Sequence, residues 1–259
     1  MELRLKFNED ATNYDRWRPV YVPELFDAII EYSNLDDTKR ALEVGIGTGQ
    51  ATLPILMTGC KVTAVEIGKE LAEYSRRKFS GFRNFEVVNV DFESFHGDSN
   101  TYDLIYSATA FHWIPEEIGY PKAFDLLKPG GTLALFWNHP FVNRSDDMLH
   151  AEIQEIYSKY RPTGDKPLVE FNESSCKKVT DTLESHGFSN VTFRLFYQTR
   201  TVSSRDYIGL LNTYSDHRSL EENIKNGLEC GIVSAIDKSG GKLNIYDTMD
   251  LHLAQKIRL

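Results

Sequence analysis

A short apolar run that leads into three alternate glycines constrains this chain more than any other feature. The run Ala41–Val44 carries Glu43 and is followed by Gly45, Gly47 and Gly49. Glycines at this spacing let the backbone adopt positive φ angles and approach a bound molecule where a Cβ atom would clash. Residues 50–57 have a helical composition, so an anionic group of that molecule would meet the unpaired N–H groups of a helix N-terminus. The segment is therefore predicted to be a strand that turns tightly around a ligand.

The spacing of these residues narrows the kind of ligand. A dinucleotide-binding turn would need a third glycine at position 50, where the chain has Gln50. A phosphate-binding P-loop would need Gly-Lys-Ser or Gly-Lys-Thr after Gly49, and no such triplet follows. A second strand, over residues 61–67, ends with Glu66, about 20 residues after the first glycine, where a carboxylate that binds ribose hydroxyls is expected. The residues favour an adenosine-containing ligand without a pyrophosphate.

Five ordered segments resemble the class I S-adenosylmethionine-dependent methyltransferases. They are Glu43–Gly49, Glu66 at the end of the second strand, Asn89–Phe92, Tyr102–Ser107 and Leu127–Leu135. Together they cover about residues 38–138. The resemblance implies an enzyme whose cofactor is S-adenosylmethionine.

The same resemblance implies roles for individual residues. Glu43, Gly45 and Gly47 would line the methionine part, Glu66 would accept hydrogen bonds from both ribose hydroxyls, and Asp91 with Phe92 would recognise adenine. The other expected cofactor contacts are Gly49, Ile67, Ser107 and Ala108. A carboxylate suits a vicinal diol because it can accept two hydrogen bonds at once. Two alternatives stay open, since Glu66 could be a solvated strand end and Asp91 could cap the next helix.

In the family, the loop after the fourth strand lines both the sulfonium and the methyl acceptor. Phe111, His112 and Trp113 are therefore expected to contact the substrate, and His139 is a further candidate. His112 could act as a general base, because its pKa lies near working pH, or it could only hold the loop in place. An acceptor that is a carboxylate would need no base but a cation to neutralise it; Arg16, Arg18 and Arg144 are the candidates.

The N-terminal pattern Tyr14-Asp-Arg-Trp-Arg18-Pro19 resembles the type 11 subgroup of small-molecule methyltransferases, which includes trans-aconitate methyltransferase-like enzymes. The segment is expected to fold as a lid, with Tyr14 and Arg18 closing over the carboxylate of the cofactor. A guanidinium fork matches a carboxylate in shape and charge. The alternative is an arm that packs for stability with Trp17 as its anchor.

Alternating strand and helix patterns predict an α/β fold with a doubly wound sheet. Strands are expected near residues 40–46, 61–67, 85–91, 102–107, 131–137, 190–202 and 242–255. Helices are expected near residues 23–33, 49–57, 68–79, 116–127, 144–160, 174–186, 203–211 and 219–235. In the family the last two strands form an antiparallel hairpin, which gives a seven-stranded Rossmann-like sheet, mostly parallel, with a helical cap. We expect an arm and lid helix over residues 1–36, the cofactor-binding core over 37–140, and the cap and final strands over 141–259.

Composition indicates which partners to expect. A net charge of −9 and a pI near 5.3 argue against a broad phosphate-binding surface, so a small-molecule substrate is expected and nucleic acid is not. No apolar run approaches the roughly 20 residues of a membrane span, so we expect no membrane contact and a cytoplasmic monomer or homodimer. Cys60, Cys176 and Cys230 form no C-x-x-C pair, so neither a disulfide framework nor a metal site is expected.

Two functions of other classes remain open. A nicotinamide-dependent oxidoreductase would share the first strand and turn, but Gln50 and the later segments disfavour it. A non-catalytic protein that binds S-adenosylmethionine could have kept the same fold, because fold alone does not determine function.

Overall fold

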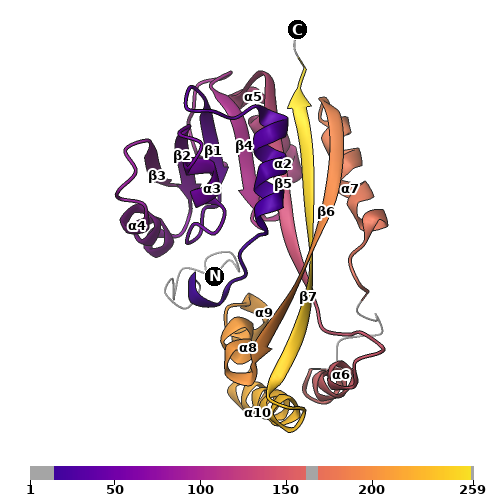
Figure 1. The fold of residues 1–259 in the computed structure, drawn as a ribbon. Coiled ribbons are helices and arrows are strands. Elements are labelled where there is room, and N and C mark those ends of the chain that lie inside the picture. The colour runs from indigo at the N-terminus through magenta and orange to yellow at the C-terminus, as the bar shows by residue number, and fades with distance from the viewer. Residues whose placement is uncertain (1–14, 162–168, 258–259) are drawn as a thin grey trace.

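A computed structural model describes residues 15–161 and 169–257, which fold around a mixed sheet (Figure 1). Its seven strands lie in the order β3-β2-β1-β4-β5-β7-β6. They are β1 (Arg40–Val44), β2 (Lys61–Glu66), β3 (Phe85–Asn89), β4 (Tyr102–Ala108), β5 (Leu127–Phe141), β6 (Phe188–Ser203) and β7 (Lys242–Lys256). Strands β1 to β5 pair in parallel, and β7 runs antiparallel to both β5 and β6. The structure confirms the predicted sheet and its antiparallel edge hairpin.

The helices begin where the sequence provides capping groups. Helix α2 has Pro23 at its first position, where the missing N–H costs nothing, and ends at Asn34 in the left-handed conformation. Asp147 caps α6, Asn172 caps α7 with a capping box, and Ser203 caps α8. The helices are α2 (Pro23–Ser33), α3 (Thr52–Leu56), α4 (Lys69–Lys78), the 3₁₀ turn η2 (Phe111–Trp113), α5 (Glu116–Leu126), α6 (Met148–Tyr160), α7 (Glu173–Ser185), α8 (Ser204–Leu211), α9 (Ser215–Arg218) and α10 (Glu222–Lys238).

Two hydrophobic cores cover the two faces of the sheet. Leu25 and Ile29 of α2 and Ile55 of α3 pack on one face. Ala123 of α5 and Leu183 of α7 pack on the other face. Strands β1, β2 and β4 are buried along nearly their whole length, as expected of parallel strands covered on both sides.

A third hydrophobic core lies beyond the parallel part of the sheet. Strands β5, β6 and β7 are 15 or 16 residues long, and Figure 1 shows their far ends extending past β1 to β4 to reach α6, α8 and α10. Leu243 and Ile245 of β7 pack there with Ile153 of α6, Leu210 of α8 and Ile232 of α10. These helices form the predicted cap.

The structure differs from the sequence expectations at several element ends. Helix α3 starts at Thr52 rather than near residue 49, because the glycine turn continues to Ala51. Helix α6 starts at Met148 rather than near residue 144, because Asp147 accepts hydrogen bonds from the first N–H groups of the helix. The turn η2 and helix α9 were not predicted, because both are too short to show periodicity.

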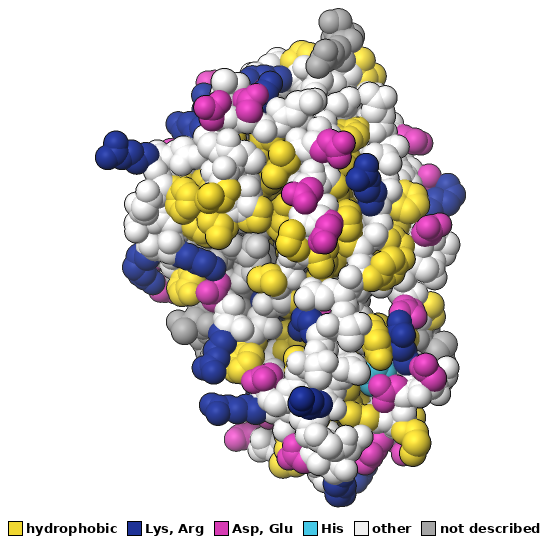
Figure 2. Space-filling view, in the orientation of Figure 1, with side chains coloured by type: hydrophobic (Ala, Val, Ile, Leu, Met, Phe, Trp, Pro, Cys, Tyr) yellow, Lys and Arg dark blue, Asp and Glu magenta, His cyan; other side chains and the backbone are white. Residues whose placement is uncertain are grey.

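Charged groups are mixed on the face that Figure 2 shows. Lys and Arg side chains are interspersed there with Asp and Glu side chains. Among the described residues, no helix combines the length and the apolar character that crossing a membrane requires.

Candidate active site

A cavity of about 360 Å³ opens at the carboxyl ends of β1, β2 and β4. This is the point where strand order reverses, with β1 between β2 and β4, and where α/β sheets bind ligands. Eleven of the residues predicted from sequence line it. Nine are predicted cofactor contacts: Arg18, Glu43, Gly45, Gly47, Glu66, Ile67, Asp91, Phe92 and Ala108. The other two, His112 and Trp113, are predicted substrate contacts. Tyr14 lies outside the described residues.

The three glycines of the turn share a positive φ angle, and at two of them a Cβ atom would also clash. All three have positive φ, at 74° for Gly45, 58° for Gly47 and 81° for Gly49. A Cβ atom on Gly45 would lie 2.5 Å from the Cβ of Ala110 in the loop after β4. A Cβ atom on Gly49 would lie 2.3 Å from the ring of Phe79. Gly49 therefore packs against the end of α4 and does not line the cavity, so its expected contact with the cofactor stays a prediction.

Glu66 is held in place by the glycine turn. Its side chain is buried, and its two oxygens accept hydrogen bonds from the backbone N–H groups of Gly47 and Gly68, both at 2.8 Å. Burial raises its pKa. Glu66 is thus no solvated strand end. Each carboxylate oxygen has a second lone pair, so the carboxylate can still accept hydrogen bonds from a diol.

Glu43 lies on β1, two residues before the glycine turn, and its side chain is buried. Its Oε2 accepts hydrogen bonds from Thr52 at 2.7 Å and from Tyr106 at 2.8 Å. Burial, partly offset by these hydrogen bonds and reinforced by the charge of Glu66, raises the pKa of Glu43 to about 7. A carboxylate that is costly to ionise alone becomes easier to ionise when a cation binds next to it.

Asp91 serves two purposes at the end of β3. It lines the cavity with Phe92, and its Oδ1 also accepts a hydrogen bond from the N–H of Ser94 at 2.6 Å. Both the ligand contact and the capping alternative are therefore compatible with its position.

At the end of β4 and in the loop after it, some residues line the cavity and others are buried in the core. Ser107 is buried and donates its hydroxyl to the carbonyl of Val44 at 2.8 Å, so it ties β4 to β1 rather than reaching the cavity. Phe111 is buried against Phe92 and Tyr120. Neither residue lines the cavity, so the ligand contacts expected of Ser107 and Phe111 stay predictions.

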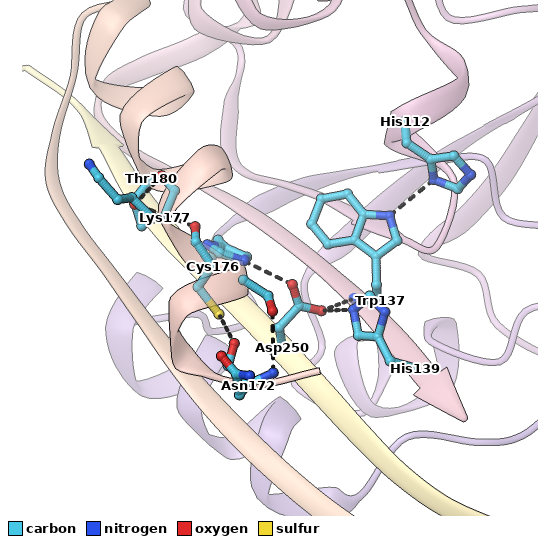
Figure 3. A network of polar contacts seen from close by, with 10 residues as sticks. His112, Trp137, His139, Asn172, Cys176, Lys177, Thr180 and Asp250 are labelled. Atoms are coloured by element: carbon cyan, nitrogen blue, oxygen red, sulfur yellow. Dashed lines mark hydrogen bonds and ion pairs between the residues drawn. The ribbon is translucent and has the colours of Figure 1, made fainter. Parts of the chain in front are cut away.

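The geometry of His112 determines its tautomer. The indole N–H of Trp137, which can only donate, lies 3.0 Å from Nδ1 of His112 (Figure 3). Nδ1 must therefore carry the lone pair, and neutral His112 holds its proton on Nε2. Burial by the surrounding wall lowers the pKa of His112, which favours the neutral ring. His112 thus offers the cavity a hydrogen-bond donor.

His139 lies away from the cavity. Its Nε2 is 2.9 Å from Oδ1 of Asp250, and its ring stacks on Phe171 with centroids 3.7 Å apart. It does not line the cavity, so the substrate contact expected of His139 stays a prediction.

Several wall residues were missed by sequence reasoning. Tyr214, Ser215 and Asp216 line the cavity from the cap, Thr109 lines it from the loop after β4, and Asn138 lines it from β5. Thr109 has a positive φ of 52°, unusual for a β-branched residue, and its hydroxyl hydrogen-bonds Tyr21 at 2.6 Å. The cap was expected on the substrate side, but no sequence pattern identified which of its residues face inward.

Comparison with known proteins identifies the domain that carries this cavity. Residues 41–131 match the methyltransferase domain family. These residues form a class I S-adenosylmethionine-dependent methyltransferase domain. The chain is accordingly a methyltransferase with S-adenosylmethionine as its cofactor.

Relatives extend the similarity beyond that domain. An uncharacterized methyltransferase-like protein of Schizosaccharomyces pombe is 28% identical over 223 residues, which cover 85% of this chain and 81% of the relative. The solved structure of a proposed type II methyltransferase from Anaeromyxobacter dehalogenans superposes with a TM-score of 0.61 at 16% identity, covering 93% of this chain and 99% of the other. The [4+2]-cyclase SpnF has a TM-score of 0.50 at 19% identity, covering 90% and 81%. At these identities the solved structures show the fold alone.

Proposed function

We propose that this methyltransferase transfers a methyl group to a carboxylate oxygen of a small molecule, as enzymes of the trans-aconitate methyltransferase-like subgroup do. The observation that carries the proposal is the tautomer of His112. With Nδ1 occupied by the Trp137 indole, the remaining nitrogen already bears a proton and cannot take one from a phenol or an amine. A donor at this position suits an acceptor group that is already ionised.

The residues around the cavity fit S-adenosylmethionine. The glycine turn leaves space that a Cβ atom would fill, Glu66 keeps lone pairs for ribose hydroxyls, and Glu43 lies where a cationic methionine end would favour its ionised form. Asp91 and Phe92 line the same cavity, and in this proposal they hold adenine. When bound, the sulfonium supplies an electrophilic methyl group: a carboxylate oxygen forms the new O–C bond, the C–S bond breaks, and the sulfur keeps the electron pair.

The protein's own contribution would be positioning and charge. Arg18 lines the cavity close to Tyr214, with its guanidinium 4.6 Å from the ring centroid, and in this proposal it neutralises the acceptor. Asp216 also lines the cavity, but Arg161 at 2.8 Å compensates its charge, and Nδ1 of His217 lies 3.1 Å from its other oxygen. A carboxylate substrate would therefore meet one cation and one hydrogen-bond donor, His112. Holding reactants in line can supply up to roughly 7–11 kcal/mol of the barrier reduction.

Two alternatives predict different ligands. A nicotinamide-dependent oxidoreductase would bind NAD(P) in this cavity, and a non-catalytic protein would bind S-adenosylmethionine without turning over any acceptor. The fold is similar to that of a cyclase, and a fold alone does not determine which reaction a protein catalyses.

A screen of acceptor classes tests the proposal. Purified protein would be incubated with S-adenosylmethionine and small di- and tricarboxylic acids, phenols or amines, and products would be identified by mass spectrometry. We expect methyl esters from the carboxylic acids and a rate that is flat from about pH 6 to 8, because the acceptor is already ionised. Methylation of phenols or amines alone, with a rate that rises through the imidazole pKa, would refute the carboxylate assignment.

Substitution of His112 separates donation from proton abstraction. His112→Ala should mainly raise the KM for the acceptor, and His112→Asn, whose amide can still donate, should recover part of that loss. A general base would instead show a fall of about 10²–10⁴-fold in kcat that asparagine does not restore. His96→Ala, at an exposed histidine outside the cavity, is the control and should change neither kcat nor the KM for the acceptor.

A further inference from the structure

A buried cluster of three metal-binding side chains lies under α7, away from the cavity. Cys176 of α7 and Asp250 and His252 of β7 place one thiol, one carboxylate and one imidazole atom within 4.8 Å of one another. All three residues are buried, and none of them lines the cavity. Figure 3 shows Cys176 and Asp250 meeting between the helix and the strand.

The topology explains why they meet. Asp250 and His252 are two residues apart on β7, so their side chains emerge on the same face of the sheet. Cys176 lies in the first turn of α7, which packs on β6 and β7. Sulfur, imidazole nitrogen and carboxylate oxygen are the ligand set that Zn²⁺ prefers in proteins, and a thiolate with a carboxylate would neutralise its two positive charges.

The distances are near those of a tetrahedral site. Bond lengths of about 2.0–2.3 Å place tetrahedral ligand atoms roughly 3.3–3.8 Å apart. Oδ2 of Asp250 is 2.9 Å from Nε2 of His252, so these two atoms need only a small separation. The sulfur of Cys176 lies within 4.8 Å of the other two ligand atoms, so it would need to move by about 1 Å at most to reach a tetrahedral distance.

Two groups outside the cluster already hold the carboxylate of Asp250 in place. Oδ1 of Asp250, the oxygen that faces away from His252, is 2.9 Å from Nε2 of His139 and accepts a hydrogen bond from the backbone N–H of Trp137 at 3.2 Å. Ligating carboxylates in metalloproteins are commonly fixed in this way. His139 is one-third exposed, so this orienting residue lies at the surface next to the buried cluster.

Hydrogen bonding alone leaves the thiol of the cluster poorly satisfied. The thiol of Cys176 reaches only the carbonyl of Asn172, at 4.0 Å. Buried polar groups in this condition are uncommon and call for an explanation.

We propose that Cys176, Asp250 and His252 bind one Zn²⁺ ion that clips α7 to β7, with water as the fourth ligand and His139 as the orienting residue. Binding of the ion releases the thiol proton to solvent. The protein then supplies three ligands, namely a thiolate, a carboxylate and an imidazole. This site is separate from the cofactor cavity. It departs from the sequence expectation of no metal, because Cys176 and the β7 pair are far apart in the chain and form no recognisable spacing.

Metal binding by the full chain tests the proposal. The protein would be stripped with chelator, loaded with Zn²⁺, dialysed against buffer with micromolar chelator and analysed for metal content; Co²⁺ would then replace Zn²⁺ for spectroscopy. We expect one ion per chain and a thiolate-to-cobalt charge-transfer band. Cys176→Ser and His252→Gln should lose both signals, and His139→Ala should weaken binding about 10–100-fold.

Two controls keep misfolding apart from loss of the site. Cys60→Ser changes a cysteine that is equally buried but lies in the opposite core, and it should retain metal and band. Every variant should still show a thermal shift with S-adenosylhomocysteine, which reports an intact cavity. A wild-type protein that retains no metal, or a band that persists in Cys176→Ser, would overturn the proposal and leave only a hydrogen-bonded cluster.

Discussion

Glu66 has two functions at the residue scale, and both depend on its burial. Its carboxylate holds the N–H groups of Gly47 and Gly68 and thereby shapes the turn in which a ligand would lie. Glu66 also lines the cavity, where its remaining lone pairs could accept hydrogen bonds from a ligand. A substitution here changes the empty protein as well as the complex, which a solvated strand end would not do.

We expect Glu66→Ala to weaken S-adenosylmethionine binding by about 1.5–3 kcal/mol, the range for hydrogen bonds to charged groups. The same substitution should also lower the free energy of unfolding of the unliganded protein by about 1–3 kcal/mol, because two buried N–H groups lose their acceptor. Calorimetry and urea denaturation measure the two effects. Glu73→Ala, at an exposed position on α4, is the control and should change neither.

Glu43 makes the stability of the protein depend on pH. Its pKa is about 7 in the folded protein, against an ordinary value of 4.5, because burial penalises the charge. When folding raises the pKa of a carboxyl group, the folded protein is most stable below the pKa that the group has in the unfolded chain. This stability is lost as pH rises toward the pKa that the group has in the folded protein. Unfolding free energy should thus fall by about 3 kcal/mol between pH 4.5 and 7 through this group alone.

Glu43→Gln should therefore flatten the decline between pH 5 and 7 and stabilise the unliganded protein at pH 8. The same variant should bind S-adenosylmethionine more weakly, because a neutral amide no longer attracts the cationic methionine end. Urea titrations at several pH values and calorimetry at pH 8 measure both changes. An unchanged pH profile would show that Glu43 is already ionised in the folded protein.

The segment before α2 is the element that joins core and cap. Asp15 receives hydrogen bonds from Lys78 at 2.6 Å and Tyr74 at 2.9 Å, both on α4. Trp17 packs so closely on α8 that a Cβ atom at Gly209 would lie 2.6 Å from its ring. Arg18 then donates to the carbonyl of Thr213 at 3.0 Å. The contacts support an anchored arm beside the cavity, and the proposed lid function of Arg18 depends on this anchoring.

Gly209→Ala tests this arm without touching the cavity. Alanine favours the helical conformation of α8, so the global stability should hold or rise, while Trp17 must move. We expect cofactor or acceptor affinity to fall by about 0.5–1.5 kcal/mol, the size of one lost hydrogen bond, as Arg18 loses its position. Gly81→Ala is the control, because no atom lies within 4 Å of its added Cβ. Equal affinities in the two variants would show that the arm does not contribute to binding.

Sequence predicted most elements because local patterns dictate them. The apolar runs of β1, β2 and β4 and the glycine turn specify a strand, a bend and a close approach within a few residues. The contact of Trp137 with His112 and the inward face of Tyr214–Asp216 could not be predicted. Both arise from side chains that meet only when β5 and the cap are in place.

At the scale of the whole molecule, the cavity draws its walls from three parts of the chain. The arm contributes Arg18, the parallel strands contribute Glu43 and Glu66, and the cap contributes Tyr214. A ligand that contacts all three should stabilise the folded chain as a unit, because binding to the native state shifts the unfolding equilibrium by mass action.

Thermal unfolding with and without ligand checks this coupling. S-adenosylmethionine or S-adenosylhomocysteine at 100-fold its Kd should add about 2.7 kcal/mol of stability. For a chain of this size that corresponds to an increase of roughly 5–10 °C in Tm. NAD(P) at the same concentration should give no shift, because the turn has Gln50 where a dinucleotide site has its third glycine. A shift with NAD(P) and none with either methionine derivative would assign the cavity to an oxidoreductase. A Glu66→Ala protein that keeps the full shift would place the ribose elsewhere.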